Sequence, residues 1–145
     1  MSTYNNILVA IDGSDESNRI LDRALKLADD NKAQLSVVLV FEPLLGNYSF
    51  ELNMADFEKV QQEHQEQVAK KVRESLASKT SSVPEDRIHF QRGKAASEIR
   101  KLADELKADL LVIGSHGHNP VRAVLGSVAN AVLHGINCDV LTVRV

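Results

Sequence analysis

Residues 109–117 read DLLVIGSHG and contain the pattern that decides the fold. The apolar run from Leu110 to Ile113 ends directly in a glycine-rich turn, as is typical of a buried parallel strand followed by a loop. The chain opens in the same way, because residues 7–11 read ILVAI and are followed by Asp12-Gly13-Ser14. We therefore expect two parallel strands whose carboxyl ends each lead into a turn.

Strand and helix patterns alternate along the rest of the chain. Apolar runs predict further strands at residues 34–41, 87–92 and 139–145. Helical periodicity predicts helices at about 15–30 and 56–79, and over the segments beginning near Ala95 and Ser127. This alternation predicts a single α/β domain over residues 1–145, a doubly wound five-stranded parallel sheet with helices on both faces.

The expected strand order is 3-2-1-4-5. With that order the chain reverses direction between the first and fourth strands, and ligands of open α/β sheets bind in the crevice at such a point. Asp12 and Gly114 both fall there. The strand at 87–92 alternates in polarity, which predicts a sheet edge with His89 at the surface. The helix at 56–79 is expected to be mostly solvated, with one inward stripe formed by Phe57, Val60, His64, Val68, Val72 and Leu76.

Composition narrows the class of protein. The 145 residues are 43% hydrophobic and carry a formal net charge of −3, so no basic field favours nucleic acid as a partner. The apolar runs are far shorter than the roughly 20 residues of a membrane helix. The N-terminus lacks the basic start and apolar stretch of a secretory signal, and Cys138 is the only cysteine. We expect a cytoplasmic protein with no membrane partner.

The glycines near the C-terminus suggest a phosphate site. Gly114 and Gly117 are followed, after eight residues, by Gly126-Ser127 at a predicted helix start. Ser127 is expected to cap that helix, so that the amides of Ser127, Val128 and Ala129 face an anion. Each glycine by itself could simply serve a turn.

The P-loop pattern and the dinucleotide fingerprint are both missing, so neither common nucleotide motif applies. His116 and His118 lack a third ligand, so no metal site is predicted.

Several stretches together resemble the universal stress protein family. They are Ile7-Leu8-Val9-Ala10-Ile11-Asp12-Gly13-Ser14, Gly114-Ser115-His116-Gly117, Leu125-Gly126-Ser127-Val128 and residues 138–144, and the resemblance covers essentially the whole chain. It implies that Ala10, Val40 and Ile113 line an adenine pocket and that Asp12 lies beside ribose and phosphates. It also implies contacts to ribose and phosphates from Gly114, Gly117, Gly126, Ser127 and Val128.

Two features keep alternatives open at this site. The family's best-known ATP motif has nine residues between its second and third glycines, whereas here residues 118–125 supply eight. Asp12-Gly13-Ser14 is also good turn chemistry, so Asp12 could simply organise the start of the first helix.

The residues favour binding over catalysis. No nucleophile, base and orienting residue form a recognisable set, and the phosphate site lacks the lysine and acidic pairing of efficient NTPases. We expect a stress-response regulatory protein that is not an enzyme and holds an adenine nucleotide. ATP is the expected cofactor, with Mg²⁺ left open as its counter-ion. The sequence leaves open slow hydrolysis, autophosphorylation, the protein partner and the stress served.

The family usually forms homodimers, and the apolar edge strand at 140–145 predicts pairing with a second copy. Two other functions remain as alternatives. One is a homodimeric interaction module of the same fold that holds no nucleotide. The other is an adenylating enzyme, whose Gly/Ser-rich turn is only loosely imitated by Asp12-Gly13-Ser14-Asp15.

Overall fold

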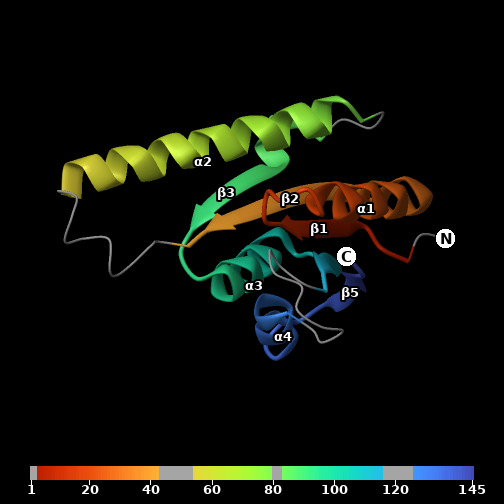
Figure 1. Cartoon of the computed structure of the whole chain (residues 1–145). Helices are drawn as coiled ribbons and strands as arrows, with labels where there is room; N and C mark the ends of the chain where they lie inside the picture. The colour runs from red at the N-terminus through yellow and green to blue at the C-terminus, as the bar shows by residue number, and fades with distance from the viewer. Residues whose placement is uncertain (1–2, 43–53, 80–82, 116–125) are drawn as a thin grey trace.

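Five parallel strands form one sheet in the order β3-β2-β1-β4-β5 (Figure 1). The computed structural model describes residues 3–42, 54–79, 83–115 and 126–145. The strands are β1 (Asn6–Ile11), β2 (Gln34–Phe41), β3 (Ile88–Arg92), β4 (Leu110–Gly114) and β5 (Asp139–Val143). The helices are α1 (Ser17–Asn31), α2 (Met54–Ala77), α3 (Ala95–Leu106) and α4 (Ser127–Leu133), with a 3-10 turn, η2, at Glu85–Arg87. The predicted fold class and strand order are confirmed.

The two central strands are the most buried part of the molecule. Leu8 and Val9 of β1 and Leu111 and Val112 of β4 have no measurable exposure, because helices cover both faces of the sheet. The two strands pair in parallel from Ile7 opposite Leu110 to Ala10 opposite Ile113. Their carboxyl ends therefore meet at the same sheet edge, where the segments after β1 and β4 begin side by side.

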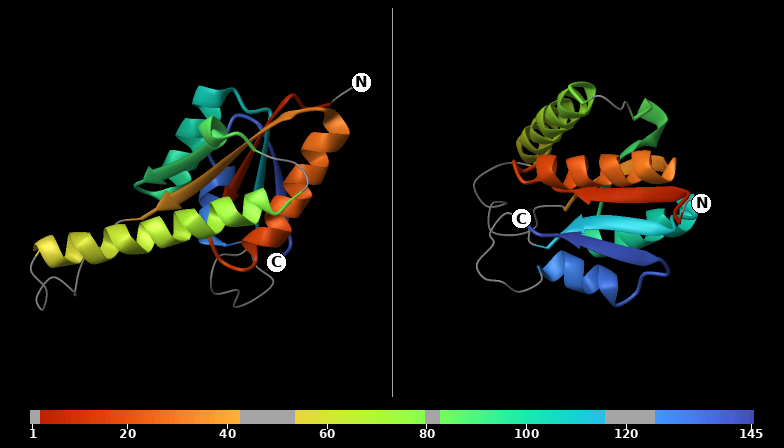
Figure 2. Two further views of the ribbon diagram at one scale, coloured as in Figure 1. Left: turned by 90° about the horizontal axis from the view of Figure 1, so that it is seen from above. Right: turned by 90° about the vertical axis from the view of Figure 1, so that its right-hand side faces the viewer.

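The helices form one layer on each face of the sheet. Figure 2 shows α1 and α2 on one side and α3 and α4 on the other. Two hydrophobic clusters match these layers, one built on Ile7, Val9 and Leu39 and the other on Leu8, Ala10 and Val38. Helix α2 also extends past the carboxyl ends of the strands (Figures 1 and 2). Within the described residues, no helix is both long and apolar enough to cross a membrane.

The predicted inward stripe of α2 is partly wrong. Val68 is half-buried, and Val72 and Leu76 are buried as predicted, but Val60 is 59% exposed and the polar Gln65 is only 8% exposed. Each step of four residues overshoots a full helical turn by about 40°, so a row drawn from Leu76 back to Val60 rotates by about 160°. Spacings of three and four must alternate to stay on one face, which brings Gln65 inward.

The edge position of β3 is confirmed, but the surface prediction for His89 is wrong. β3 pairs with β2 alone, so it is the outer strand on that side. His89 lies opposite Val38 of β2 and is half-buried, and its Nε2 atom is buried without a hydrogen-bond partner in the described part of the chain. An edge strand exposes its backbone on one side only, so its side chains can still be covered by the helix layer.

Candidate functional site

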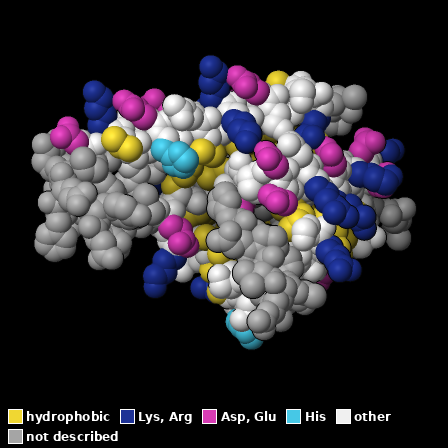
Figure 3. All heavy atoms as spheres, in the orientation of Figure 1, with side chains coloured by type: hydrophobic (Ala, Val, Ile, Leu, Met, Phe, Trp, Pro, Cys, Tyr) yellow, Lys and Arg dark blue, Asp and Glu magenta, His cyan; other side chains and the backbone are white. Residues whose placement is uncertain are grey.

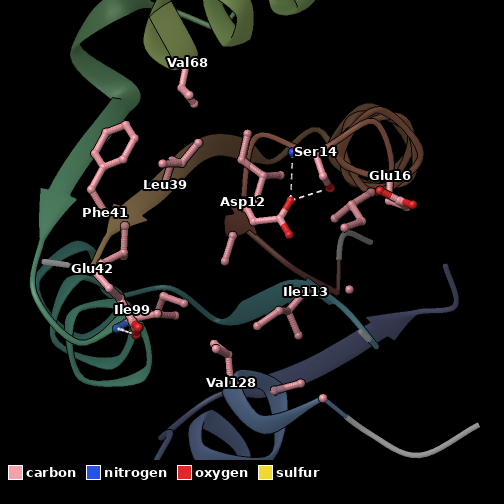
Figure 4. A pocket seen from close by; sticks show the side chains of 18 of the residues that line it. Asp12, Ser14, Glu16, Leu39, Phe41, Glu42, Val68, Ile99, Ile113 and Val128 are labelled. Atoms are coloured by element: carbon pink, nitrogen blue, oxygen red, sulfur yellow. Dashed lines mark hydrogen bonds between the residues drawn. The ribbon is translucent and has the colours of Figure 1, made fainter. Parts of the chain in front are cut away.

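A cavity of about 490 Å³ opens at the carboxyl ends of β1, β2 and β4 (Figure 4). Its wall is completed by the residues at the starts of α1, α3 and α4 and by one face of α2. This volume is within the usual range for a small-molecule site, and the place is the switch point where the chain reverses direction between β1 and β4. Sheet topology alone therefore accounts for the position of the cavity.

The predicted site residues converge on this cavity. Those that fall in the described part of the chain all line it: Ala10, Asp12, Val40, Ile113, Gly114, Gly126, Ser127 and Val128. Gly117 lies outside the described residues, as do His116 and His118. The lining residues come from four separate segments, so their meeting is a product of the fold.

The cavity has two sides, one on each face of the sheet. Ala10, Val40 and Ile113 belong to the cluster beneath α3 and α4. Ile11, Leu39 and Phe41 belong to the cluster beneath α1 and α2, because neighbouring residues of a strand point to opposite faces. Figure 4 shows Leu39 and Val68 on one side of Asp12, with Ile113 and Val128 on the other. Asp12 therefore lies between two compartments.

Asp12 organises the turn between β1 and α1. Its Oδ1 accepts hydrogen bonds from the backbone N–H of Ser14 at 3.0 Å, from the Ser14 hydroxyl at 2.6 Å and from the Ser17 hydroxyl at 3.1 Å. Ser17 Oγ in turn accepts from the N–H of Gly13 at 3.1 Å. The structural role that the sequence left open for Asp12 is thus present, and it does not conflict with a place in the cavity wall.

The start of α4 differs from the prediction by one residue. Gly126 is the N-cap and Ser127 is the first helical residue, so the Ser127 hydroxyl does not cap the helix. The Gly126 N–H donates to the Ser115 carbonyl at 2.6 Å, which joins the end of β4 to this turn. Val128 is 36% exposed, and Ala129 takes the buried position in this turn. A glycine N-cap supplies no side-chain acceptor for the first amides of the helix.

Those amides belong to residues that line the cavity. No hydrogen bond from the backbone N–H groups of Ser127, Val128 or Ala129 is found among the described residues, whereas Asn130 N–H bonds the Gly126 carbonyl at 2.9 Å. Amides at a helix start carry partial positive charge and suit an anionic or polar ligand group.

Carboxylates dominate the charge of the described lining. Asp12, Glu16 and Glu42 line the cavity, and no lysine or arginine does so within the described residues. Glu42 Oε1 accepts a hydrogen bond from the Ala95 N–H at 2.9 Å, so this carboxylate stabilises the start of α3. In the same part of the chain, no group of three or more His, Cys, Asp and Glu side chains could hold a metal ion. Among the described residues, the partial positive charge at the start of α4 is what offsets these carboxylates.

One wall of the cavity was not anticipated from the sequence. Gln61, His64, Gln65 and Val68 of α2 line it, whereas the sequence placed only His64 and Val68 of these on the inward stripe of a mostly solvated helix. Their spacing of three, one and three residues puts them on one helix face. The available signal was a change of polarity, since this face is apolar at Val72 and Leu76 and becomes polar at Gln65, two turns before Val72.

Comparison with known proteins agrees with this architecture. The chain matches the model of the Universal stress protein family over residues 3–144. It is 39% identical over 144 residues to universal stress protein A homolog 1 of Coxiella burnetii, covering 97% of this chain and 96% of that protein.

Solved structures show the same fold. The universal stress protein UspA of Lactobacillus plantarum superposes with a TM-score of 0.78 at 21% identity, covering 99% of this chain and all of that one. A universal stress protein solved in complex with cAMP superposes with a TM-score of 0.64 at 28% identity, covering 99% and 98% of the two chains. From the match over nearly its whole length, this chain belongs to the universal stress protein family.

Proposed function

We propose that this protein is a cytoplasmic regulator of the stress response that binds an adenine nucleotide in the cavity at the ends of β1 and β4. The observation that carries the proposal is the convergence of the separately predicted residues on that one cavity. The relative solved with cAMP, at 28% identity over nearly the whole chain, supports an adenine nucleotide as the ligand class. ATP is the nucleotide that we propose for this chain.

The α3/α4 compartment suits a purine base. Its strand residues Ala10, Val40 and Ile113 are small or branched apolar side chains, and Ile99 of α3 adds to the same wall. Such a surface removes the faces of a flat heterocycle from water, while backbone groups at strand ends can satisfy the polar edge of the ring. The base would therefore lie against the carboxyl ends of the strands.

The triphosphate would lie toward the start of α4. The Gly126, Ser127 and Val128 segment offers backbone amides there, and Gly114 ends the neighbouring strand. The carboxylates of Asp12 and Glu16 would repel phosphates unless a cation lay between them. Mg²⁺ usually binds through one or two carboxylates together with phosphate oxygens, so it fits this donor set only as a companion of the nucleotide. When bound, it would neutralise phosphate charge beside Asp12.

Calorimetric titration with ATP, with and without Mg²⁺, tests the proposal. Val128→Glu places a carboxylate at the helix start without removing a buried group, and an acidic residue there suits the helix dipole. We expect saturable binding to the natural protein and at least about a tenfold loss of affinity in Val128→Glu, since repulsion of about 1.4 kcal/mol suffices for that factor.

Leu133→Glu is the matched control, because Leu133 is 42% exposed on the same helix and is not part of the cavity lining. Its affinity for ATP should equal that of the natural protein. Equal ATP affinity in Val128→Glu and Leu133→Glu would mean that the triphosphate does not lie at this helix start.

We also propose that the protein forms homodimers through β5. This strand is the outer strand on its side of the sheet, and Val140, Leu141 and Val143 are half-buried rather than buried. An edge strand with apolar side chains can continue its sheet into a second copy. Light scattering should give about twice the mass of one chain, and Leu141→Lys should reduce it to that of one chain.

One observation favours a second candidate function. The described cavity lining carries three carboxylates and no lysine or arginine, which is unusual for a pocket that holds phosphates. An interaction module of the same fold that holds no nucleotide would need no such cation. Native mass spectrometry of gently purified protein separates the two functions, since a retained mass equal to an adenine nucleotide supports the first and no binding of added ATP supports the second.

A further inference from the structure

A separate cavity of about 230 Å³ lies at the amino ends of β1, β2 and β3. The end of α3 borders it through Leu106 and Ala108. In a parallel sheet the amino ends of the strands share one edge and the carboxyl ends share the other, so this cavity and the cavity proposed for the nucleotide lie at opposite edges. The two have no lining residue in common. The proposed nucleotide contacts therefore leave this cavity without a role.

Arg87 is the cationic side chain among the described lining of this cavity. On the face shown in Figure 3, Lys and Arg side chains lie among Asp and Glu side chains, and some of them form ion pairs, such as Lys79 with Asp22 at 2.6 Å. The Arg87 side chain is half-buried, and it makes no hydrogen bond or ion pair with any described residue. A guanidinium group donates in a planar fork that matches a carboxylate, so Arg87 is suited to bind one.

His89 adds a hydrogen-bond donor to the same cavity. Its Nε2 atom is buried without a partner among the described residues, whereas Nδ1, which makes no hydrogen bond there either, is not buried. A buried N–H without an acceptor is costly, so the proton of the neutral ring belongs on Nδ1 and Nε2 keeps its lone pair. Because His89 lies opposite Val38, its ring is on the α3 side of the sheet, where this cavity lies.

The rest of the lining limits the charge and the size of a ligand. Asp86 contributes an exposed carboxylate, and the carboxyl end of α3 carries partial negative charge. Both disfavour a doubly charged group such as phosphate, whereas Arg87 can balance a single carboxylate. Leu106 and Ala108 are apolar and half-buried, so they suit a short hydrocarbon chain next to that carboxylate.

We infer that this cavity is a second ligand site, which binds a small organic monocarboxylate. The carboxylate accepts hydrogen bonds from the Arg87 guanidinium and from His89 Nδ1–H, and the apolar chain lies against Leu106. Arg87 also lines a neighbouring cavity on the α1 side of the sheet, where Lys32 is a second cation. His89 lines the first cavity and not the neighbouring one, so its contribution decides between them.

An NMR titration of the ¹⁵N-labelled protein with sodium butyrate at constant ionic strength tests this inference. We expect saturable shifts of the Arg87 Nε–H and His89 backbone amide resonances with one dissociation constant. Butyramide has the same chain without the charge, and it should bind at least about tenfold more weakly, since charge-assisted hydrogen bonds are the stronger ones. Inorganic phosphate should also bind more weakly than butyrate. Tighter binding of phosphate would overturn the assignment to a monocarboxylate.

Three variants complete the test. Arg87→Gln removes the charge, and we expect butyrate affinity to fall at least about tenfold. His89→Phe keeps a ring but removes the Nδ1–H donor, so binding should be about fivefold weaker. It also removes the buried nitrogen without a partner, so thermal melting should show no loss of stability. Arg23→Gln makes the same charge change at an exposed position of α1 outside this cavity, and should bind butyrate like the natural protein.

The inference is overturned if butyrate causes no saturable shifts, or if Arg87→Gln binds it with unchanged affinity. It is also overturned if His89→Phe binds butyrate as tightly as the natural protein, and a loss of affinity in Lys32→Gln would then place the carboxylate in the neighbouring cavity. ATP titrations keep the two proposals apart, because ATP affinity should change by less than about twofold in Arg87→Gln. Absence of ATP binding would reject the proposed function, while butyrate still decides the second site.

Discussion

Two strand-to-helix turns meet at the same edge of the sheet, and they treat their polar groups in opposite ways. In the turn after β1, Asp12, Gly13, Ser14 and Ser17 satisfy one another through side-chain hydrogen bonds. In the turn before α4, Gly126 bonds back to Ser115, and the next three amides have no partner among the described residues. One turn is closed on itself, and the other offers donors to something else.

The two turns should therefore contribute to different properties, the β1–α1 turn to stability and the start of α4 to binding. A polar group satisfied within the chain contributes to the folded state, and its removal costs free energy of unfolding. A donor left without a partner contributes nothing to folding and gains its partner only when a ligand arrives. We therefore expect substitutions in the β1–α1 turn to lower stability, and substitutions at the start of α4 to lower affinity with little change in stability.

The largest expected effect in this comparison comes from Gly13→Ala. Gly13 has φ = +82°, and a Cβ atom there would lie 2.8 Å from Val68 Cγ1. The left-handed backbone alone disfavours alanine by about 1–2 kcal/mol, and the contact with a branched side chain adds to it. We expect the free energy of unfolding to fall by about 2–3 kcal/mol in urea denaturation. A loss below about 0.5 kcal/mol would mean that this turn tolerates rearrangement.

Ser17→Ala is expected to have the next largest effect. Ser17 is 5% exposed, donates to Asp12 and accepts from the Gly13 N–H. Alanine leaves that N–H without its acceptor, which costs about 1–1.5 kcal/mol in the free energy of unfolding. Ser17→Thr, which keeps the hydroxyl, is the control for denaturant melts and should recover part of the loss. If the alanine variant were as stable as the natural protein, the hydrogen bonds within this turn would not stabilise the folded state.

Ser127→Ala tests the turn before α4, where we expect little effect on stability. The Ser127 side chain is exposed and makes no hydrogen bond among the described residues, and the cap position belongs to Gly126. We expect the free energy of unfolding to change by less than about 0.5 kcal/mol, whereas loss of a serine cap would cost about 1 kcal/mol. Thermal melting of the two proteins side by side distinguishes these values. A clear loss of stability would mean that the Ser127 hydroxyl does cap the helix.

Cys138 directly precedes β5, and its reactivity is a smaller test of how buried this edge of the sheet is. Burial, together with the nearby negative charges of Asp139 and Asp104, raises the pKa of its thiol. A raised pKa lowers the thiolate fraction at neutral pH, and the thiolate is the reactive species. Reaction with a thiol reagent at pH 7.5 should therefore be slower than that of free cysteine. A rate equal to that of free cysteine would mean that the thiol is more accessible than the structure indicates.

Most of the fold could be predicted because its signals are local. The run Gln34–Phe41 is a strand with the predicted bounds, the turn residues after Ile11 mark the end of β1, and β4 ends at the predicted Gly114. Parallel strands with helical crossovers then leave few possible topologies. The cavity-lining residues of β1 and β4 follow from that topology, since they stand at the carboxyl ends of buried strands.

The rest depends on contacts between distant segments. The cap position at Gly126 rather than Ser127 is a shift of one residue, which falls within the usual uncertainty of helix ends. The burial of Gln65 in the second wall could not be predicted, because it comes only from the packing of α2 over β2 and from the pairing with Arg92. A polar residue on a long helix otherwise indicates solvent.

The most direct test of nucleotide binding at the start of α4 is to record amide NMR spectra during an ATP titration. The account predicts saturable shifts of the Ser127, Val128 and Ala129 amide resonances, with smaller shifts at Gly13 and Ser14, whose hydrogen bonds are already made. Shifts confined to residues 13–17, or unchanged resonances across both turns at saturating ATP, would contradict it.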